Sequence, residues 1–198
     1  MAKMFPTRPF LQAASAAVVI ALAACAGDEA AMPLAKPAIA GTGYQVQAAQ
    51  LEVLDGYDAP GHAPNIDHQL SLIPEDALVS WAKRRFKPVG HSGVMRVIIL
   101  DASVTRRDLL GPDAGSSWFR DRAAEEYNGR AEVRLEFLHG NGRTKDWATA
   151  IATARRTVNE SAEPAERRAE QDALVRELLR KLDREALAAS RKFMQSAL

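Results

Sequence analysis

Alternation of apolar and polar residues predicts the main strands of this chain. Residues 130–138 alternate most clearly, with inward-facing positions at Ala131, Val133, Leu135 and Phe137. A period of two is typical of a strand with one covered face. Residues 44–54 alternate toward their end, and residues 94–104 centre on an apolar run at 97–100. We therefore expect a first strand at 44–54 and a central strand at 94–104, the latter covered on at least one face.

Two stretches with helical spacing follow different strands. Pro74 opens the first helix, because its missing N–H costs nothing at the first helical position, and Pro88 with Gly90 ends it. Ser161 can cap the second helix. The apolar stripe of that helix comprises Val175, Leu178, Leu179, Leu182, Ala186, Ala189 and Phe193. We expect this stripe to lie on the sheet.

The order of these elements predicts the fold class. The Asn141-Gly142 pair favours a tight hairpin turn, after which residues 144–158 return as a further strand. The resulting order is β-α-β-β-β-α. It predicts an α+β fold, a two-layer sandwich in which two helices lie on one face of a mainly antiparallel sheet.

Residues 106–129 interrupt the pattern with a polar, irregular insertion, in which we expect only a short helical turn near residues 118–126. Trp118 and Phe119 are adjacent in this insertion. Tryptophan is enriched at protein interfaces, so this pair is our candidate for contact with a partner protein or a membrane interface. The alternative is that the pair folds back as a lid over the open end of the sheet.

The N-terminus has the pattern of a secretory signal. Residues 1–10 carry Lys3 and Arg8 and no acid, and residues 11–24 are almost wholly apolar. The apolar segment is shorter than the roughly 20 residues that a membrane span needs. It ends in small residues, as signals do before their cleavage site. The only cysteine of the chain, Cys25, follows directly.

Leu22-Ala23-Ala24-Cys25 resembles the lipobox of bacterial lipoprotein precursors. The resemblance implies cleavage before Cys25 and a thioether from its thiolate, the nucleophilic form of cysteine, to a diacylglyceryl group. This acyl lipid is the only cofactor we expect, and two or more chains attach a protein stably to a membrane. Ala26 stands where an aspartate would favour retention in the inner membrane of enteric bacteria. We therefore expect an anchored protein that faces the periplasm, with the outer membrane favoured over the inner.

These features divide the chain into a lipoprotein signal peptide at 1–24, the lipidated cysteine with a flexible tether at 25–43, and a single α/β sandwich domain at 44–198. The chain has 26 basic and 25 acidic residues, and loss of Lys3 and Arg8 with the signal leaves 24 against 25, a net charge of −1. A chain this close to neutral has no overall attraction to nucleic acid. Once Cys25 is modified, no disulfide can form.

Histidines near an acid suggest a metal site, but their spacing does not support one. His62, Asp67 and His68 are close in sequence, and His91 follows the first helix. No two histidines have the tight spacing typical of zinc ligands. The alternative is a structured turn in which Asn65 and Asp67 bond to the local backbone, and we expect no metal.

Catalytic and phosphate-binding patterns are also weak. Ser103 lies two residues from Asp101 without a recognisable base, and the chain has no G-x-S-x-G elbow. We therefore expect no enzyme. The basic residues Lys83-Arg84-Arg85 and Arg155-Arg156 are either a lipid-headgroup contact or a solvated face balanced by neighbouring acids.

Residues 63–68 and 96–104 are similar to segments of small envelope accessory lipoproteins, such as the auxiliary lipoproteins of lipid-transport systems, and of uncharacterised lipoproteins of Gram-negative bacteria. The resemblance implies a membrane-anchored, non-enzymatic accessory or scaffold whose partner is an envelope protein. The alternative is a lipid- or small-molecule-binding module with its ligand between the helices and the sheet.

Overall fold

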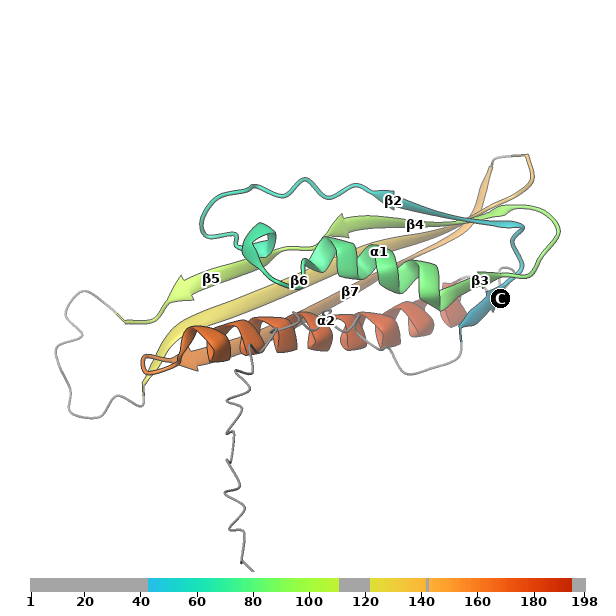
Figure 1. The fold of residues 1–198 in the computed structure, drawn as a ribbon. Coiled ribbons are helices and arrows are strands. Elements are labelled where there is room, and N and C mark those ends of the chain that lie inside the picture. Colours follow the sequence, from blue (N-terminus) through green and yellow to red (C-terminus); the bar gives the residue numbers. More distant parts are fainter. Residues whose placement is uncertain (1–42, 111–121, 142, 194–198) are drawn as a thin grey trace, which may run out of the picture. The chain divides into compact units, whose positions relative to one another are not determined.

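The computed structural model of the protein describes residues 43–193 except for 111–121 and 142. The elements in chain order are β1 (Tyr44–Val46), β2 (Gln50–Asp55), the 3₁₀ helix η1 (Asp67–Gln69), α1 (Pro74–Arg85), β3 (Phe86–Pro88), β4 (Val94–Asp101), β5 (Val104–Asp108), β6 (Ala123–Leu138), β7 (Thr144–Asn159) and α2 (Pro164–Phe193) (Figure 1). The signal peptide, Cys25, Trp118 and Phe119 lie outside the described residues, so the predictions for them stay predictions.

The main sheet has five strands and is built around β6. One edge of β6 pairs first with β5 and then with β4, both antiparallel, while the other edge pairs antiparallel with β7 along nearly its whole length. Strand β2 extends the sheet by pairing in parallel with β4, and β1 and β3 form a separate parallel pair. The predicted fold class, an α+β sandwich with a mainly antiparallel sheet, is confirmed.

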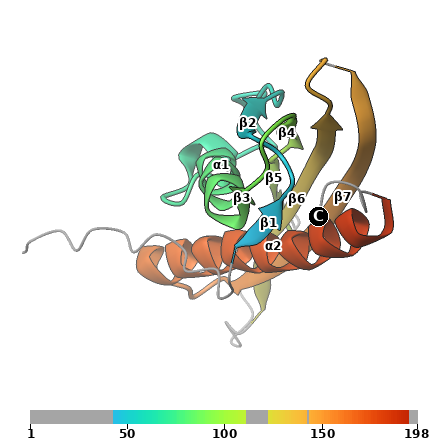
Figure 2. The same cartoon turned by 90° about the vertical axis from the view of Figure 1, so that its right-hand side faces the viewer.

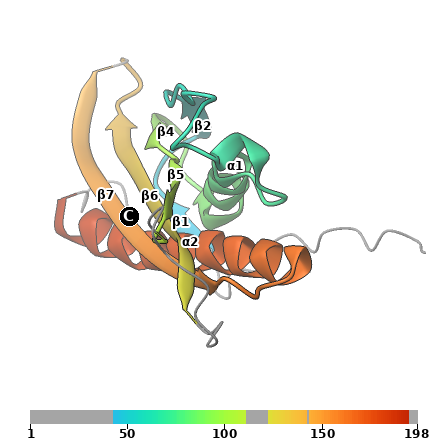
Figure 3. The same cartoon turned by 90° about the vertical axis from the view of Figure 1, so that its left-hand side faces the viewer.

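Both helices cover the same face of this sheet. The inward positions predicted on β6 are buried, and their neighbours in β4 and β7 are buried with them in one core that also contains the apolar side chains of α1 and α2. Five of the predicted stripe residues of α2 are buried: Val175, Leu178, Leu179, Leu182 and Ala186. In Figures 2 and 3, β7 forms one margin of the sheet and α1 lies toward the margin formed by β2.

Three predicted elements differ from the structure in the first half of the chain. Residues 44–54 form two strands instead of one, because β1 pairs with β3 whereas β2 pairs with β4. The short strand β3 follows α1 directly, where the sequence predicted only the end of a helix. The predicted strand at 94–104 is interrupted at Ala102-Ser103, and the chain then continues along the same edge of β6 as β5.

Two further predictions in the second half are wrong in detail. Residues 123–129 belong to β6 and are neither a loop nor helical, because β7 pairs with them on one side and β5 pairs with residues 125–129 on the other. Helix α2 begins at Pro164, so Glu163 and not Ser161 directly precedes it. The backbone N–H of Arg167 donates to the Glu163 carbonyl at 3.0 Å, which makes the first turn of the helix.

A buried polar cluster joins α1, α2 and β1. Asp183 of α2 is 8% exposed and accepts a hydrogen bond from the indole Nε1 of Trp81 at 2.9 Å. Arg85 donates to the same carboxylate through Nη2 at 2.9 Å, and its guanidinium lies 3.9 Å from the ring centre of Tyr44. Because Asp183 lies about a hundred residues from both donors, this cluster fixes how the two helices pack against each other.

We expect Gly93→Ala to destabilise the fold by about 2 kcal/mol or more. Gly93 has φ of +79°, and a Cβ placed there would lie 2.6 Å from the backbone oxygen of Leu138. The positive φ and the clash both lie where β4 begins. Because the clash is with a backbone oxygen, no change of side-chain rotamer relieves it. Urea unfolding measures the change. Gly140→Ala is the matched control, because a Cβ there meets nothing closer than 3.9 Å; equal effects of the two substitutions would contradict this explanation.

Candidate functional site on the uncovered sheet face

Among the described residues, no helix covers the second face of the sheet (Figures 2 and 3), and the side chains of this face come from alternate positions of the strands. Register places Arg134 of β6 between Ile98 of β4 and Thr149 of β7, and Leu54 of β2 next to Ile98. Residues that alternate with these point into the core. This surface, the open face, is the candidate functional site.

Ion pairs run across the strands of the open face. Arg96 of β4 lies 2.9 Å from Glu52 of β2 and 3.7 Å from Glu136 of β6. Arg134 pairs with the same Glu136 at 2.9 Å, and its guanidinium lies 5.1 Å from the ring centre of Trp147. Opposite charges therefore face each other across neighbouring strands, which stabilises the sheet and leaves the surface close to neutral.

A second group of charges surrounds Glu126, which is only 6% exposed. Its carboxylate accepts hydrogen bonds from Asn128 at 3.0 Å, from Arg107 of β5 at 2.8 Å and from Arg155 of β7 at 3.3 Å. The hydrogen bond from Asn128 and the nearby charges of Arg107 and Arg155 lower the pKa of Glu126. This carboxylate therefore joins β5, β6 and β7.

Large apolar side chains interrupt these ion pairs. Leu54 is 43% exposed, Leu100 40%, Trp147 56% and Ile151 44%. Interfaces between proteins combine exposed aromatic and apolar residues with arginine. The open face has that composition, because Trp147 lies beside Arg134 while the apolar side chains stand on strands on either side.

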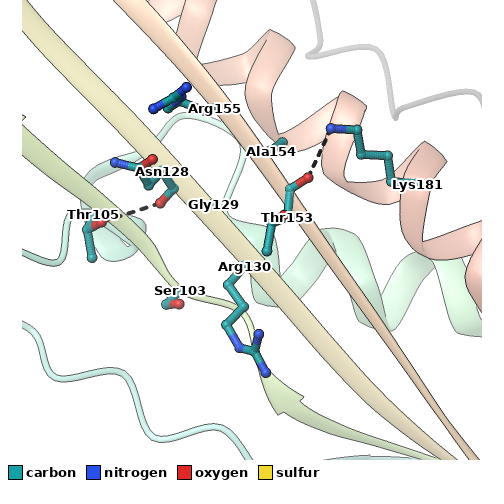
Figure 4. A pocket seen from close by; sticks show the side chains of 9 residues that line it. All are labelled: Ser103, Thr105, Asn128, Gly129, Arg130, Thr153, Ala154, Arg155 and Lys181. Atoms are coloured by element: carbon teal, nitrogen blue, oxygen red, sulfur yellow. Dashed lines mark hydrogen bonds between the residues drawn. The ribbon is translucent and has the colours of Figure 1, made fainter.

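A polar hollow of about 440 Å³ lies on the open face between β5 and β7 (Figure 4). It is lined by Ser103, Thr105, Asn128, Gly129, Arg130, Thr153, Ala154, Arg155 and Lys181. Its three cations are already balanced: Arg130 lies 2.9 Å from Asp101, Arg155 pairs with Glu126, and Lys181 lies 3.0 Å from Glu177. The hydroxyl and amide groups of the lining suit a ligand that is polar and uncharged.

The candidate nucleophile Ser103 lines this hollow, but its surroundings do not activate it. The backbone N–H of Ser103 donates to Asp101 Oδ1 at 2.9 Å, and the other carboxylate oxygen of Asp101 pairs with Arg130. Both carboxylate oxygens of Asp101 therefore have other partners, and Asp101 holds the backbone at Ser103 in place. Among the residues that line the hollow, none is a histidine.

The histidine loop forms a second, smaller hollow of about 270 Å³ at the start of α1. Asp67 is buried there, and its carboxylate accepts hydrogen bonds from Tyr57 Oη at 3.5 Å and from Asn65 Nδ2 at 3.4 Å. His68 lines the same hollow, whereas the His62 ring bonds to the neighbouring Ala63 carbonyl at 2.9 Å. Within the part of the chain that the structure describes, no group of three or more His, Cys, Asp or Glu residues is placed to hold a metal ion.

We expect the stability of the fold to decrease as the pH rises from about 4.5 through 7, and Glu75→Gln to remove part of this decrease. A hydrogen bond with Asp55, then burial, then the charge of Asp55, raise the pKa of Glu75 from its usual 4.5 to about 7. The folded protein therefore holds this proton more tightly than the unfolded chain, and that stabilisation is lost as Glu75 ionises. Urea unfolding at pH 5 and pH 8 measures it.

The control for this pH effect is Glu166→Gln, an exposed acid in the first turn of α2. We expect it to leave the difference in stability between pH 5 and pH 8 unchanged. If Glu75→Gln also leaves that difference unchanged, the shared proton between Glu75 and Asp55 does not contribute to stability.

The basic clusters are divided between different roles. Lys83 and Arg84 are exposed, whereas Arg85 turns inward to Asp183. Arg155 pairs with Glu126, and Arg156 lies 2.8 Å from Glu177. The interpretation as a face balanced by neighbouring acids therefore fits Arg155-Arg156 better than a headgroup site does.

Comparison with known proteins gives only distant similarity. No protein-family profile matches this chain, and no curated protein matches it. A solved structure of rare lipoprotein B from Shewanella oneidensis is 16% identical over 72% of this chain and 94% of that chain, with a TM-score of 0.38. A minor lipoprotein from Acinetobacter baumannii is 13% identical over 73% of this chain and 92% of that chain, also with a TM-score of 0.38. Similarity at this level carries no argument about function.

In the part of the chain that the structure describes, no helix is long and apolar enough to cross a membrane.

The space between helices and sheet is filled by large buried side chains, among them Trp81, Met95, Leu174 and Leu178. A ligand between the layers, as the sequence suggested, therefore has no support in this packing. The hollow of the open face was not predicted, because its lining comes from β5, β6, β7, Ser103 and Lys181 of α2, which are far apart in the sequence.

Proposed function

We propose that the protein is a lipoprotein anchored through Cys25 in the periplasmic leaflet of a membrane, with the outer membrane favoured, and that it acts as a non-enzymatic accessory or scaffold of an envelope complex. The observation that carries this proposal is Leu22-Ala23-Ala24-Cys25 directly after a basic and then apolar N-terminus. An acylated cysteine at this position gives a stable attachment.

The open face supports a role in binding a protein partner. It combines Trp147, Ile151 and Leu100, all more than a third exposed, with the paired arginines Arg96 and Arg134. Tryptophan and arginine dominate the energetically important contacts of interfaces. Ser103, the best candidate nucleophile in the described residues, has no base beside it, which argues against a hydrolase at this site.

Complementation tests the importance of the anchor. In a Gram-negative strain whose own copy of the gene is deleted and that shows an envelope defect, we expect the parent chain to restore growth and the Cys25→Ser chain to fail while reaching the periplasm in equal amount. Full complementation by soluble Cys25→Ser protein would show that anchoring is not required for function.

A second candidate function is the binding of a small polar molecule, and the hollow of about 440 Å³ on the open face favours it. Hydroxyl groups of Ser103, Thr105 and Thr153 and the amide of Asn128 can bond to an uncharged polar ligand. Native mass spectrometry of the Cys25→Ser chain purified from the periplasm tests this function. A bound small molecule lost in Thr153→Trp, which fills the hollow, would favour it over the accessory role.

A further inference from the structure

Among the described residues, strand β7 has one edge that pairs with no other strand. Strand β7 is 16 residues long, and β6 is the one strand with which it pairs among the described residues. Figures 2 and 3 show no strand beyond it at this margin of the sheet. A free edge presents backbone N–H and C=O groups that can pair with another extended chain.

The hydrogen-bond pattern identifies which residues of β7 face outward. Arg130 N–H donates to the Ser103 carbonyl at 2.9 Å, so the backbone groups of Arg130 point away from β7. Thr153 lies opposite Arg130, and in an antiparallel ladder its own groups then point away from β6. Lys181 Nζ donates to the Thr153 carbonyl at 3.0 Å, which agrees with this direction. The residues from 147 to 157 whose backbone groups face the free edge are therefore Trp147, Thr149, Ile151, Thr153, Arg155 and Thr157.

These outward residues have a sequence symmetry about Ile151. Residues 148–154 have the sequence Ala-Thr-Ala-Ile-Ala-Thr-Ala, which is the same in both directions. When two identical antiparallel strands pair about a twofold axis at Ile151, Ile151 lies opposite itself and Thr149 opposite Thr153. The next pair outward is Trp147 with Arg155, in which a guanidinium meets an indole ring. Each of these pairs is favourable in a sheet.

The outward positions of β7 also lack most of the features that protect a free edge. Protected edges are short, or carry prolines and several charges. Strand β2, at the opposite margin, is six residues long and carries Glu52 and Asp55. By contrast, Arg155 is the one charge among these six positions of β7, and none of them is proline.

We propose that β7 pairs antiparallel with β7 of a second copy of this chain, about a twofold axis through Ile151, so that the two sheets become continuous. The outward N–H and C=O groups of Ile151, and those of Thr149 and Thr153, then exchange hydrogen bonds between the copies. The Thr153 carbonyl already accepts a hydrogen bond from Lys181 Nζ, and its second lone pair accepts the bond from the other copy. The axis keeps the helices of both copies on one side and joins their open faces on the other. This inference does not depend on the proposed function, because it uses only the edge and its sequence.

Cysteine crosslinking of the full chain in its membrane tests the pairing and its register. In Ile151→Cys, the two Cα atoms would be about 5.5 Å apart, within the span of a disulfide, so we expect a crosslinked dimer after copper–phenanthroline oxidation. In Thr149→Cys alone, the two thiols are four residues apart along the paired strands, about 13 Å. We therefore expect no more crosslinked dimer than the parent chain gives. Differently tagged Thr149→Cys and Thr153→Cys chains, produced together, should crosslink to each other.

The result that overturns the proposal is equal crosslinking of Ile151→Cys and Thr149→Cys, or none in any variant. Equal crosslinking would indicate edge association without a fixed register. The parent chain gives the background that Cys25 contributes. If the parent itself crosslinks strongly, Cys25 is not acylated and the proposed anchor fails, while the difference between the two variants still reports on β7.

The size of the full chain in mild detergent provides a second measurement. We expect a dimer for the parent chain, and at least a tenfold higher dissociation constant for Ile151→Lys, because like charges then lie directly opposite each other. Leu100→Lys is the matched control: it also places a lysine on an exposed apolar position of the open face, but away from the β7 edge. A monomeric parent, or equal weakening by both lysines, would overturn the proposal.

Discussion

Asp183→Ala is expected to lower the free energy of unfolding by about 3–5 kcal/mol, the usual cost of removing one partner from a buried ion pair. The substitution leaves the guanidinium of Arg85, whose side chain is 11% exposed, without its carboxylate. It also removes the acceptor of the Trp81 indole N–H. Both donors belong to α1, so the loss loosens the packing of α1 on α2. Urea unfolding of the Cys25→Ser chain measures the effect.

Glu185→Ala is the matched control for this prediction. It removes an acid two positions along the same helix, but Glu185 is exposed, and we expect a change within about 0.5 kcal/mol. If the two substitutions destabilise the protein equally, the buried cluster does not hold the helices together, and apolar packing alone accounts for their arrangement.

Cys25→Ser is expected to move the protein almost completely from the membrane fraction to the soluble periplasm. Serine cannot form the thioether that carries the acyl chains, so the chain loses this attachment to the membrane. Fractionation followed by immunodetection measures the distribution. Mass spectrometry of the N-terminal peptide of the parent chain should show an acylated Cys25.

The control for this distribution is Ala26→Ser, which changes the neighbouring residue and leaves Cys25 in place. We expect it to remain in the membrane fraction. A Cys25→Ser chain that stays fully membrane-bound would contradict the lipoprotein interpretation and indicate an uncleaved N-terminal anchor or a tightly held membrane partner.

The sequence predicted those elements in which local pattern and tertiary packing agree. Residues 130–138 alternate, and the structure buries Val133, Leu135 and Phe137 while Arg134 faces outward. The alternation is informative because this sheet has one covered and one open face. The stripe of α2 was predictable for the same reason, since a helix on a sheet needs one apolar side.

The elements that were mispredicted depend on pairing between distant segments. Nothing local distinguishes Phe86–Pro88 from the end of a helix, and it becomes a strand because β1 pairs with it. Residues 123–129 are polar on one side because Glu126 and Asn128 face the open side of the sheet. That polarity predicted a loop, but in the structure these residues form part of β6, with β5 paired on one edge and β7 on the other.

Side-chain partners across the sheet could not be predicted either. Arg85 stands in a run of three basic residues, and only the structure shows that it alone turns inward to Asp183. The hollow on the open face combines Asn128 of β6 and Thr153 of β7 with Ser103, which lies between β4 and β5. No spacing in the sequence brings such residues together. The palindrome at 148–154, by contrast, is visible in the sequence, but its meaning depends on which backbone groups face outward.

The measurement that tests the anchored accessory role most directly is crosslinking in living cells of a C-terminally tagged chain, followed by purification and identification of its partners. The Cys25→Ser chain serves as the unanchored control, and Trp118→Ala tests the candidate contact residue. We predict that one envelope complex is recovered with the anchored chain and lost without the anchor. Recovery of no specific protein from either chain would contradict the accessory role and favour the binding of a small polar molecule.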